Sequence, residues 1–402
     1  MFYFYKGDKV KMKVVFVSNY YNHHQAPFSQ AMSRLTNGKF WFIENEEISQ
    51  ERKNMGWGEK NIPIYVRQAY TGENCRRECI GLIDSADIVI FENTTRELVL
   101  DRLKAGKLTF LYSERYFKEG YEWWKLPIRL ITWHKVFDRY KNHYLLCASA
   151  YTAADFALTL NYINKTYKWG YFPAVQKHEI NELMEKKRFL KNGKEQVSIL
   201  WAGRLIEFKH PEMAIYLAEK LREHGYAFTL QIIGNGKMEE KLRGMIQEKN
   251  LCEYVEMLGA MTPDKVREYM EHSNIFLFTS DFGEGWGAVL NESMNSGCAV
   301  VASHAIGSVP FLLENGKNGL IYQNGNEQDF FNKVEKLIVD SEFRKKLGMA
   351  AYKTMLETWN AEVAAERILK LSEDLMKNGK SDRFSKGPCS KAEILWNGWF
   401  KV

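Results

Sequence analysis

The feature that most constrains the fold is an alternation of apolar strands and helix-length segments, which occurs twice along the chain. In the first half, continuous β-branched and aromatic runs with polar exits lie at 13–21, 86–93, 108–115 and 143–149. Such runs are typical of strands buried on both faces of a parallel sheet, and the segments between them are long enough for crossover helices. A second series begins with strands at 197–205 and 228–236, and residues 210–225 between them form an amphipathic helical pattern. Each series predicts an open α/β sheet.

The polar, charged stretch 176–196 separates the two series and predicts a connection between two domains. A chain of 402 residues is too long for one ordinary core, so two domains are expected. We therefore predict an α/β architecture in which two Rossmann-like domains face each other across a cleft. The predicted division is an N-terminal domain over 1–175, the connection over 176–196, a C-terminal domain over 197–357, and a C-terminal helix and tail over 358–402 that pack back on the N-terminal domain.

The distribution of charge indicates which half of the chain meets an acidic partner, and the cysteine content indicates the cellular compartment. Residues 1–190 contain 29 Lys and Arg against 21 Asp and Glu, whereas the remainder contains 27 against 29. We therefore expect only the first half to meet an acidic partner. No apolar run approaches the roughly 20 residues of a membrane span, and the first residues lack the pattern of a signal peptide. Six dispersed cysteines indicate a reduced, cytoplasmic protein rather than a disulfide framework.

Two cations mark the turn after the first strand of the second series. In GRLIEFK, Arg204 follows the strand and Lys209 stands where the next helix begins. A planar guanidinium and a mobile ammonium at one turn suit a diphosphate. Two solvated surface cations would give the same pattern, so this pair alone leaves both interpretations open.

The stretch DFGEGWGAVLNESMNSGCAVVAS, residues 281–303, places two carboxylates around a glycine-rich loop. Glycines let backbone N–H groups approach a ligand because no Cβ intervenes, and the N-terminus of the following helix would face a phosphate. Glu284 in the loop and Glu292, expected more than a turn into that helix, could accept hydrogen bonds from sugar hydroxyls. A helix-terminal glutamate and an exposed one would explain each carboxylate singly, but not the glycines around them.

At these residues the sequence resembles the retaining family 4 glycosyltransferases, which have the GT-B fold. EGWGxVxxE resembles the family's paired-glutamate signature, and the similarity of motif order and spacing extends over most of 197–325. The resemblance implies that Arg204 and Lys209 hold the diphosphate of a nucleotide sugar and stabilise the leaving group. It implies that Glu284 binds the transferred sugar and Glu292 the ribose. The backbone that would line the phosphate and the sugar belongs to Gly285, Trp286, Gly287, Ala288 and Val289.

The resemblance also implies that neither a metal nor a cofactor is needed. The two cations give a physical reason, because the charge on a departing diphosphate is already met. No Asp-x-Asp metal motif is visible in the chain, which agrees with this expectation.

The first half matches this family less well. Members often carry two glycines in the loop after the first strand, where this chain has SNYYNHHQAP. Asn22, His23 and His24 could supply polar contacts there, or could belong to an ordinary surface loop. Glu114 stands at a strand end where related enzymes place a polar residue near the acceptor, or it pairs with Arg115. Asn22, His23 and Glu114 are the acceptor-side candidates.

Acceptor binding is expected of the basic first domain, in which residues 122–144 interleave aromatic and aliphatic side chains with Lys and Arg. Such a segment can lie on an anionic bilayer, which would suit a lipid-linked acceptor and a peripheral position at the inner face of a membrane. A helix that packs its apolar side on the sheet would have the same pattern. Nucleic-acid binding is not expected, because no recognised module is present.

Together these features predict a retaining, metal-independent hexosyltransferase. It would move a sugar from a UDP- or GDP-linked donor to a glycan or lipid-linked acceptor in cell-surface polysaccharide or glycolipid assembly. We expect front-side displacement, in which the leaving phosphate oxygen takes the acceptor proton, and a covalent sugar ester on Glu284 is the mechanistic alternative. The functional alternatives are a nucleotide-sugar epimerase of the same fold and a non-catalytic protein that binds nucleotide sugars or glycans.

Overall fold

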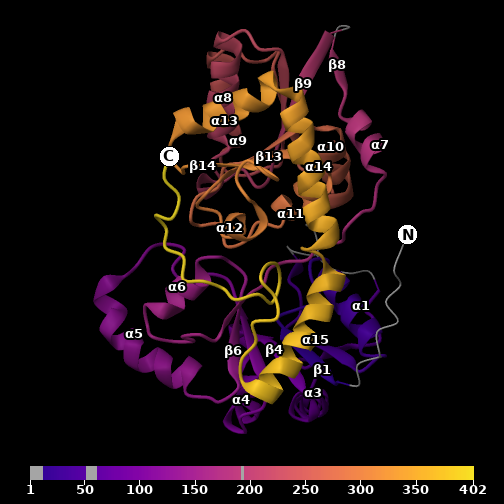
Figure 1. The fold of residues 1–402 in the computed structure, drawn as a ribbon, viewed down its shortest axis with the longest axis vertical. Helices are drawn as coiled ribbons and strands as arrows, with labels where there is room; N and C mark the ends of the chain where they lie inside the picture. The colour runs from indigo at the N-terminus through magenta and orange to yellow at the C-terminus, as the bar shows by residue number, and fades with distance from the viewer. Residues whose placement is uncertain (1–11, 51–60, 192–193) are drawn as a thin grey trace.

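Two β-sheets, one in each half of the chain, organise the protein (Figure 1). The computed structural model describes residues 12–50, 61–191 and 194–402. Helices cover both sheets, and the two halves are stacked along the long axis of the molecule. The predicted pair of Rossmann-like domains is confirmed.

The first sheet has seven strands in the order β3-β2-β1-β4-β5-β6-β7, and every neighbouring pair is parallel. Strands β1 and β6 are buried along their whole length, which explains their continuous apolar sequence. The strands are β1 (Val14–Ser18), β2 (Phe40–Glu44), β3 (Val66–Gln68), β4 (Ile88–Glu92), β5 (Thr109–Ser113), β6 (His143–Cys147) and β7 (Thr166–Lys168). The helical segments between them are α1 (Ala26–Leu35), α3 (Glu73–Ser85), η1 (Asn93–Thr95), α4 (Arg96–Lys104), η2 (Trp123–Lys125), α5 (Leu126–Trp133), η3 (His134–Asp138) and α6 (Thr152–Ala157).

The second sheet repeats this arrangement in the order β11-β10-β9-β12-β13-β14, with β8 added antiparallel to β9. Its strands are β8 (Phe189–Lys191), β9 (Lys194–Ala202), β10 (Phe228–Ile233), β11 (Val255–Gly259), β12 (Ile275–Phe278), β13 (Ala299–Ser303) and β14 (Leu320–Tyr322). Its helical segments are α7 (Ile180–Lys186), η4 (Glu207–Lys209), α8 (Glu212–Glu223), α9 (Glu239–Glu248), α10 (Pro263–His272), α11 (Val289–Asn295), α12 (Val309–Leu312), α13 (Glu327–Val339) and α14 (Ser341–Glu357).

In each sheet the strand order reverses beside the first of the parallel strands in sequence. The reversal lies between β1 and β4 in the first sheet and between β9 and β12 in the second. Ligands of open α/β sheets bind beyond the carboxyl ends of the strands at such a reversal. The topology therefore points to the turns after these four strands.

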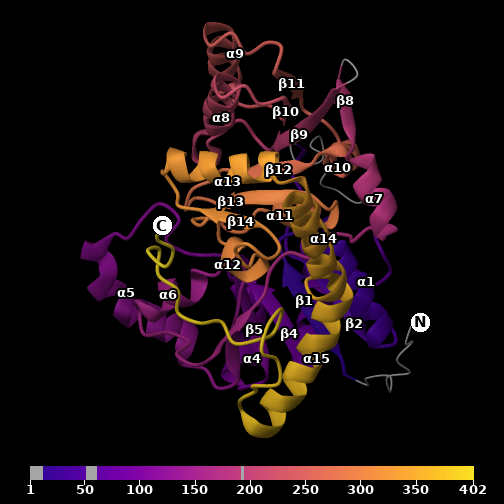
Figure 2. The same cartoon turned by 45° about the horizontal axis from the view of Figure 1, so that its top comes forward.

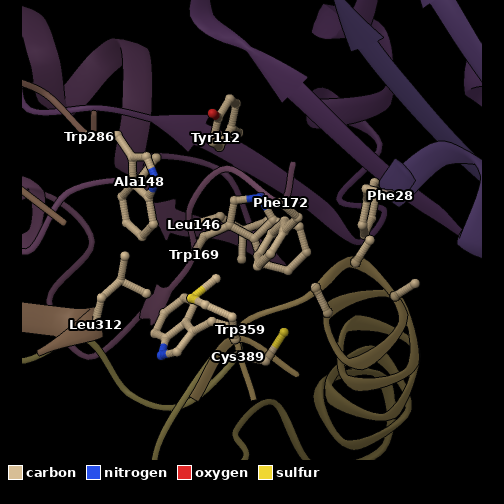
Figure 3. Close-up of a cluster of buried hydrophobic side chains, with 14 of the residues drawn as sticks. Phe28, Tyr112, Leu146, Ala148, Trp169, Phe172, Trp286, Leu312, Trp359 and Cys389 are labelled. Atoms are coloured by element: carbon tan, nitrogen blue, oxygen red, sulfur yellow. The ribbon is translucent and has the colours of Figure 1, made fainter. Parts of the chain in front are cut away.

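A shared apolar core joins the two domains (Figure 3). Trp286 of the second domain is fully buried and lies among Trp169, Phe172 and Trp359 in this core. The ring of Trp286 packs so closely on Gly170 that any Cβ at residue 170 would overlap it. The two domains thus touch directly at this point.

The C-terminal region returns to the first domain (Figures 1 and 2). Helix α15 (Ala361–Asn378) packs along α1, and Arg34 pairs with Glu362 between the two helices. The tail then lies beside β7, where the Lys168 N–H donates to the Ser390 carbonyl at 2.7 Å and Tyr167 bridges to Lys391. Among the residues that the structure describes, no helix is long and apolar enough to cross a membrane.

Candidate functional site

Two turns of the C-terminal domain lie side by side at the reversal of its sheet. Turn 203–210 follows β9, and loop 279–287 follows β12. The Asp281 N–H donates to the Phe208 carbonyl at 2.9 Å. Thr279 Oγ1 donates to the Lys209 carbonyl at 2.7 Å and accepts from Trp201 Nε1 at 2.8 Å. These bonds fix the two turns relative to each other.

Lys209 and Glu284 meet between these turns as an ion pair, and each side chain is nearly buried. Ser280 Oγ donates a second hydrogen bond to the same Glu284 oxygen at 3.0 Å. The Lys209 stem lies on Gly203, where a Cβ would approach Lys209 Cδ to 3.3 Å. Two of the three predicted catalytic residues therefore lie together.

Arg204 differs from Lys209 in its surroundings. Its side chain is exposed, and within the described part of the chain it forms neither an ion pair nor a hydrogen bond. It is a free guanidinium on the same turn as the buried Lys209. A ligand phosphate would therefore meet it without having to displace a protein partner.

His210 is a third cation on this turn, and the sequence analysis did not single it out. Its Nδ1 lies 2.9 Å from Glu212 Oε1 and its Nε2 lies 3.1 Å from Asp281 Oδ2. These hydrogen bonds to Asp281 and Glu212 raise the pKa of His210 to about 9, so the ring is an imidazolium at neutral pH. The sequence contained one signal for this role of His210. His210 directly follows Lys209, and Asp281 is the first residue of the glycine-rich stretch.

The glycine-rich loop presents backbone donors. Within the residues that the structure describes, the N–H groups of residues 285–288 have no acceptor. Gly287 has a φ of 79°, and a Cβ there would overlap the Phe278 ring, so only glycine fits. Free N–H groups beside three cations form an arrangement that binds anions.

Glu292 lies nearer the start of helix α11 than predicted, in the first turn rather than more than a turn into the helix. The backbone is left-handed at Gly287, Ala288 is the N-cap residue, and the helix begins at Val289. Burial raises the pKa of Glu292, and the charge of Arg267 acts in the opposite direction. Arg267 donates to the Glu292 carbonyl at 2.9 Å and to the Ala174 carbonyl at 2.7 Å.

Trp286 contributes to the interface between domains rather than to a free surface. Its Nε1 donates to Asn291 Oδ1 at 2.9 Å, and its side chain is fully buried. The whole residue, backbone included, is 0% exposed. Ala288 and Val289 are partly buried at the start of α11.

Glu114 of the N-terminal domain reaches this loop. A Cβ on Gly285 would overlap the Glu114 carboxylate and would lie 2.7 Å from Lys118 Nζ. Glu114 pairs with Lys118 and accepts from the Tyr171 hydroxyl at 2.7 Å. The predicted donor loop and the predicted acceptor residue Glu114 are therefore neighbours, although Arg115 pairs elsewhere, with the buried Asp155 at 3.2 Å.

Glu92 and Ser18 meet at the reversal of the first sheet. Ser18 Oγ donates to Glu92 Oε1 at 2.8 Å, and Gln25 Nε2 lies 3.4 Å from the same oxygen. Burial raises the pKa of Glu92 to about 7, and the nearby Glu114 adds to the shift. A carboxyl that titrates near neutrality at a strand end is a frequent feature of functional sites.

Asn22, His23 and His24 lie in the loop after β1. Asn22 Oδ1 accepts from the His24 N–H at 2.9 Å, which shapes the loop itself. The His23 and His24 rings lie 3.9 Å apart, and His24 stacks on Tyr171 at 5.9 Å. Burial, together with His23, lowers the pKa of His24 to about 3, so His24 is neutral. Within the described residues, no group of three His, Cys, Asp or Glu side chains is placed to hold a metal ion.

Comparison with known proteins identifies the second half of the chain. The sequence profile of the family "Glycosyl transferases group 1" matches residues 184–354. An uncharacterized glycosyltransferase of Methanocaldococcus jannaschii is 32% identical over 121 residues, which are 30% of this chain and 34% of that protein. The poly(ribitol-phosphate) alpha-N-acetylglucosaminyltransferase of Staphylococcus aureus is 28% identical over 170 residues, 42% of this chain and 34% of that protein. The matched region thus spans about a third of the length of these curated relatives.

Solved structures show the same overall fold. Anabaena HepE in complex with UDP superposes with a TM-score of 0.65 at 14% identity, over 90% of this chain and 100% of that one. A sucrose-phosphate synthase of Thermosynechococcus elongatus gives 0.62 at 13% identity, over 91% of this chain and 99% of that one. Residues 184–354 thus match the glycosyl transferases group 1 family, and the whole chain has the two Rossmann-like domains of the GT-B fold.

Proposed function

We propose that this protein is a retaining glycosyltransferase that moves a sugar from a nucleoside diphosphate sugar to a glycan or lipid-linked acceptor. The observation that carries the proposal is the joining of turn 203–210 to loop 279–287. It gathers Arg204, Lys209, His210 and the free N–H groups around one small region, and Glu114 of the other domain adjoins it. An anionic donor and a hydroxyl acceptor would meet between such surfaces.

The first step assigned to this chain is the binding of the donor diphosphate. Arg204 is free to form a bidentate contact with a phosphate. Lys209 would approach a second phosphate oxygen while Glu284 keeps its stem in place. The N–H groups of residues 285–288 would complete the anion site, and the carboxylates of Glu284 and Glu292 would accept hydrogen bonds from sugar and ribose hydroxyls.

The transfer itself would be a front-side displacement. The bond between the anomeric carbon and the phosphate oxygen breaks, and the acceptor oxygen bonds to that carbon on the same face. The acceptor proton passes to the departing phosphate oxygen, so atoms and charge balance without a protein base. Arg204 and Lys209 would stabilise the negative charge that grows on the diphosphate.

We propose that UDP is the nucleotide of the sugar donor. We propose that the acceptor belongs to cell-surface polymer or glycolipid assembly. HepE was solved with UDP and with UDP-glucose. A relative from Campylobacter jejuni, 31% identical over 160 residues, is named for transfer to a diphospho-undecaprenol-linked sugar. A cytoplasmic location at the inner face of a membrane belongs to this proposal and agrees with six free cysteines.

The proposal is tested by incubating the full chain with UDP-, GDP- and ADP-sugars, with and without a membrane-lipid extract. We expect release of UDP that depends on the extract, and a product that keeps the anomeric configuration of the donor. Conversion of the donor sugar without extract would indicate an epimerase, and donor binding without turnover would indicate a silent binding protein. A sugar ester trapped on Glu284 would replace front-side displacement by a covalent mechanism.

A further inference from the structure

The most exposed apolar surface of the N-terminal domain lies on and just before helix α5. Trp123, Trp124, Ile128 and Ile131 are 61%, 73%, 63% and 63% exposed. Residues 124, 128 and 131 follow helical spacing, so they share one side of the helix. We call these four residues the α5 face. Four large exposed apolar side chains on one surface are typical of a surface that contacts another protein, a ligand or a membrane.

The opposite side of α5 accounts for the packing of this segment. Trp133 stacks on Phe117 at 5.6 Å, and the Arg129 guanidinium lies 5.0 Å from the same Phe117 ring. Phe137 is buried and meets Phe156 edge to face at 5.2 Å. Trp133 and Phe137, which belong to the same amphipathic segment, therefore pack inward. The four side chains of the α5 face stay exposed and are not needed for this packing.

The charges around the α5 face are predominantly positive. Lys125 and Arg129 both pair with Glu122. Further along, Lys135, Arg139 and Lys141 are exposed and pair with no acidic side chain that the structure describes. A surface of tryptophan and isoleucine bordered by exposed cations is complementary to the acyl and headgroup regions of an anionic bilayer.

A second apolar element adjoins the α5 face. Leu158, at the end of α6, lines one hollow together with Trp123 and Leu126, so the turn after α6 lies next to α5. Leu160 in that turn is 67% exposed and Ile163 is 45% exposed. Both views of the ribbon show α5 and α6 on the same outer side of the N-terminal domain (Figures 1 and 2).

We propose that the α5 face docks this protein on an anionic lipid bilayer, with Trp123 and Trp124 at the headgroup level and Ile128 and Ile131 below them. The segment begins shortly after Glu114, the acceptor-side residue that adjoins the donor loop. Docking would therefore hold the acceptor side of the site near lipid-linked acceptors. This consequence for catalysis rests on the proposed glycosyl transfer, whereas the docking itself does not.

The test is flotation of the full chain with vesicles of phosphatidylcholine alone or with about 30 mol% phosphatidylglycerol, at about 0.05 M and 0.5 M salt. We expect co-flotation with the anionic vesicles at low salt and weaker binding at high salt. The double variant Trp123→Ser, Trp124→Ser should lower the bound fraction at least about tenfold, and Ile128→Ser, Ile131→Ser should act likewise, because apolar insertion is lost.

The matched control replaces two equally exposed residues at the other edge of the domain. Ile62 and Ile64 are 59% and 91% exposed, and the variant Ile62→Ser, Ile64→Ser should float like the natural chain. Far-UV circular dichroism and UDP titration of every variant show whether fold and donor site are intact.

Three outcomes would overturn the docking proposal. They are failure of the natural chain to float, unchanged flotation of both α5-face variants, or loss of self-association instead of lipid binding in these variants. The last would make the α5 face a contact between protein copies. Flotation without nucleotide release from any sugar donor would support the docking proposal and contradict the proposed glycosyl transfer. Nucleotide release without flotation would contradict the docking proposal alone.

Discussion

At the residue scale, two cations on one turn have different structural roles. Lys209 is nearly buried and pairs with Glu284, so its charge also serves the fold. Arg204 is exposed and, among the described residues, has no partner, so its charge is available only to a ligand. Substitution of each residue should separate these roles.

We predict that Arg204→Met weakens UDP binding and lowers turnover about 10²- to 10³-fold, with little effect on stability. Lys209→Met should lower turnover similarly but should also reduce the free energy of unfolding by about 1–3 kcal/mol, because Glu284 loses its cationic partner. Titration calorimetry with UDP, nucleotide-release rates and urea unfolding check both parts. Lys220→Met, at an exposed pair with Glu223, is the control that should change neither quantity. Equal turnover in all three variants would contradict the diphosphate assignment.

His210 gives the joined turns a dependence on pH. Its pKa is raised from 6.5 to about 9 by hydrogen bonds to Asp281 and Glu212, so the folded state binds the proton more tightly than the unfolded chain. The stabilisation is complete below pH 6.5 and is lost as the pH rises through about 9. Because the ring is half-exposed, solvent screening reduces the effect to about 1 kcal/mol.

Urea unfolding at pH 6 and at about pH 9.5 should therefore show a larger loss of stability in the natural chain than in His210→Gln. The difference between the two proteins should be about 1 kcal/mol. The same pH dependence in both proteins would show that His210 does not couple the turns.

At the element scale, glycine decides how closely the loops of the C-terminal domain approach. Gly234, in the loop after β10, has a φ of 139°, and a Cβ there would overlap the Gly203 carbonyl oxygen. Gly244, inside α9, has open space around the position of a Cβ. The same substitution at these two sites should have opposite effects.

We predict that Gly234→Ala lowers the free energy of unfolding by about 2–4 kcal/mol, because backbone rather than a flexible side chain must move. Gly244→Ala should raise it by about 0.5–1 kcal/mol through helix propensity. Thermal and urea unfolding of both variants provide the measurement. A neutral Gly234→Ala would show that the loop after β10 does not pack on turn 203–210 as described.

At the scale of the whole molecule, Trp286 connects loop 279–287 to the domain interface. Its ring fills the shared core against Gly170 while its backbone belongs to the loop that faces the proposed ligand. The C-terminal tail adds a second connection, since Trp399 Nε1 donates to the Tyr151 hydroxyl at 2.9 Å and Asn397 contacts both Arg115 and His304. Apolar packing around Trp286 and hydrogen bonds of the C-terminal tail thus both connect the domains.

We predict that Trp286→Ala lowers stability by about 3–5 kcal/mol, the usual cost of truncating a buried tryptophan. The loss of the shared core should also separate the unfolding of the two domains, so circular dichroism and tryptophan fluorescence would report different midpoints. The exposed Trp124→Ala should change neither stability nor cooperativity. A single unshifted transition in Trp286→Ala would contradict the role of this core.

Much of the proposed donor site could be predicted because its residues are close in sequence. Arg204 and Lys209 stand on one turn, and Glu284 and Glu292 stand around one loop, so strand-turn-helix patterns were enough to place them. Strands β3 and β7, which have three residues each, were not predicted because they are too short for a clear pattern, and β2 was not predicted either. The meeting of Ser18 with Glu92, and of Glu114 with Gly285, had no local signal at all.

The sequence by itself determined the two alternating series, the order of the motifs and the family resemblance of residues 184–354, because strand and helix periodicity and motif spacing are local properties of the chain. Only the tertiary structure decided that Lys209 pairs with Glu284, that His210 joins the two turns and that Trp286 faces the other domain. It also decided which apolar residues of 122–144 remain outside. These features arise from contacts between segments far apart in sequence, and packing of the whole chain selects them.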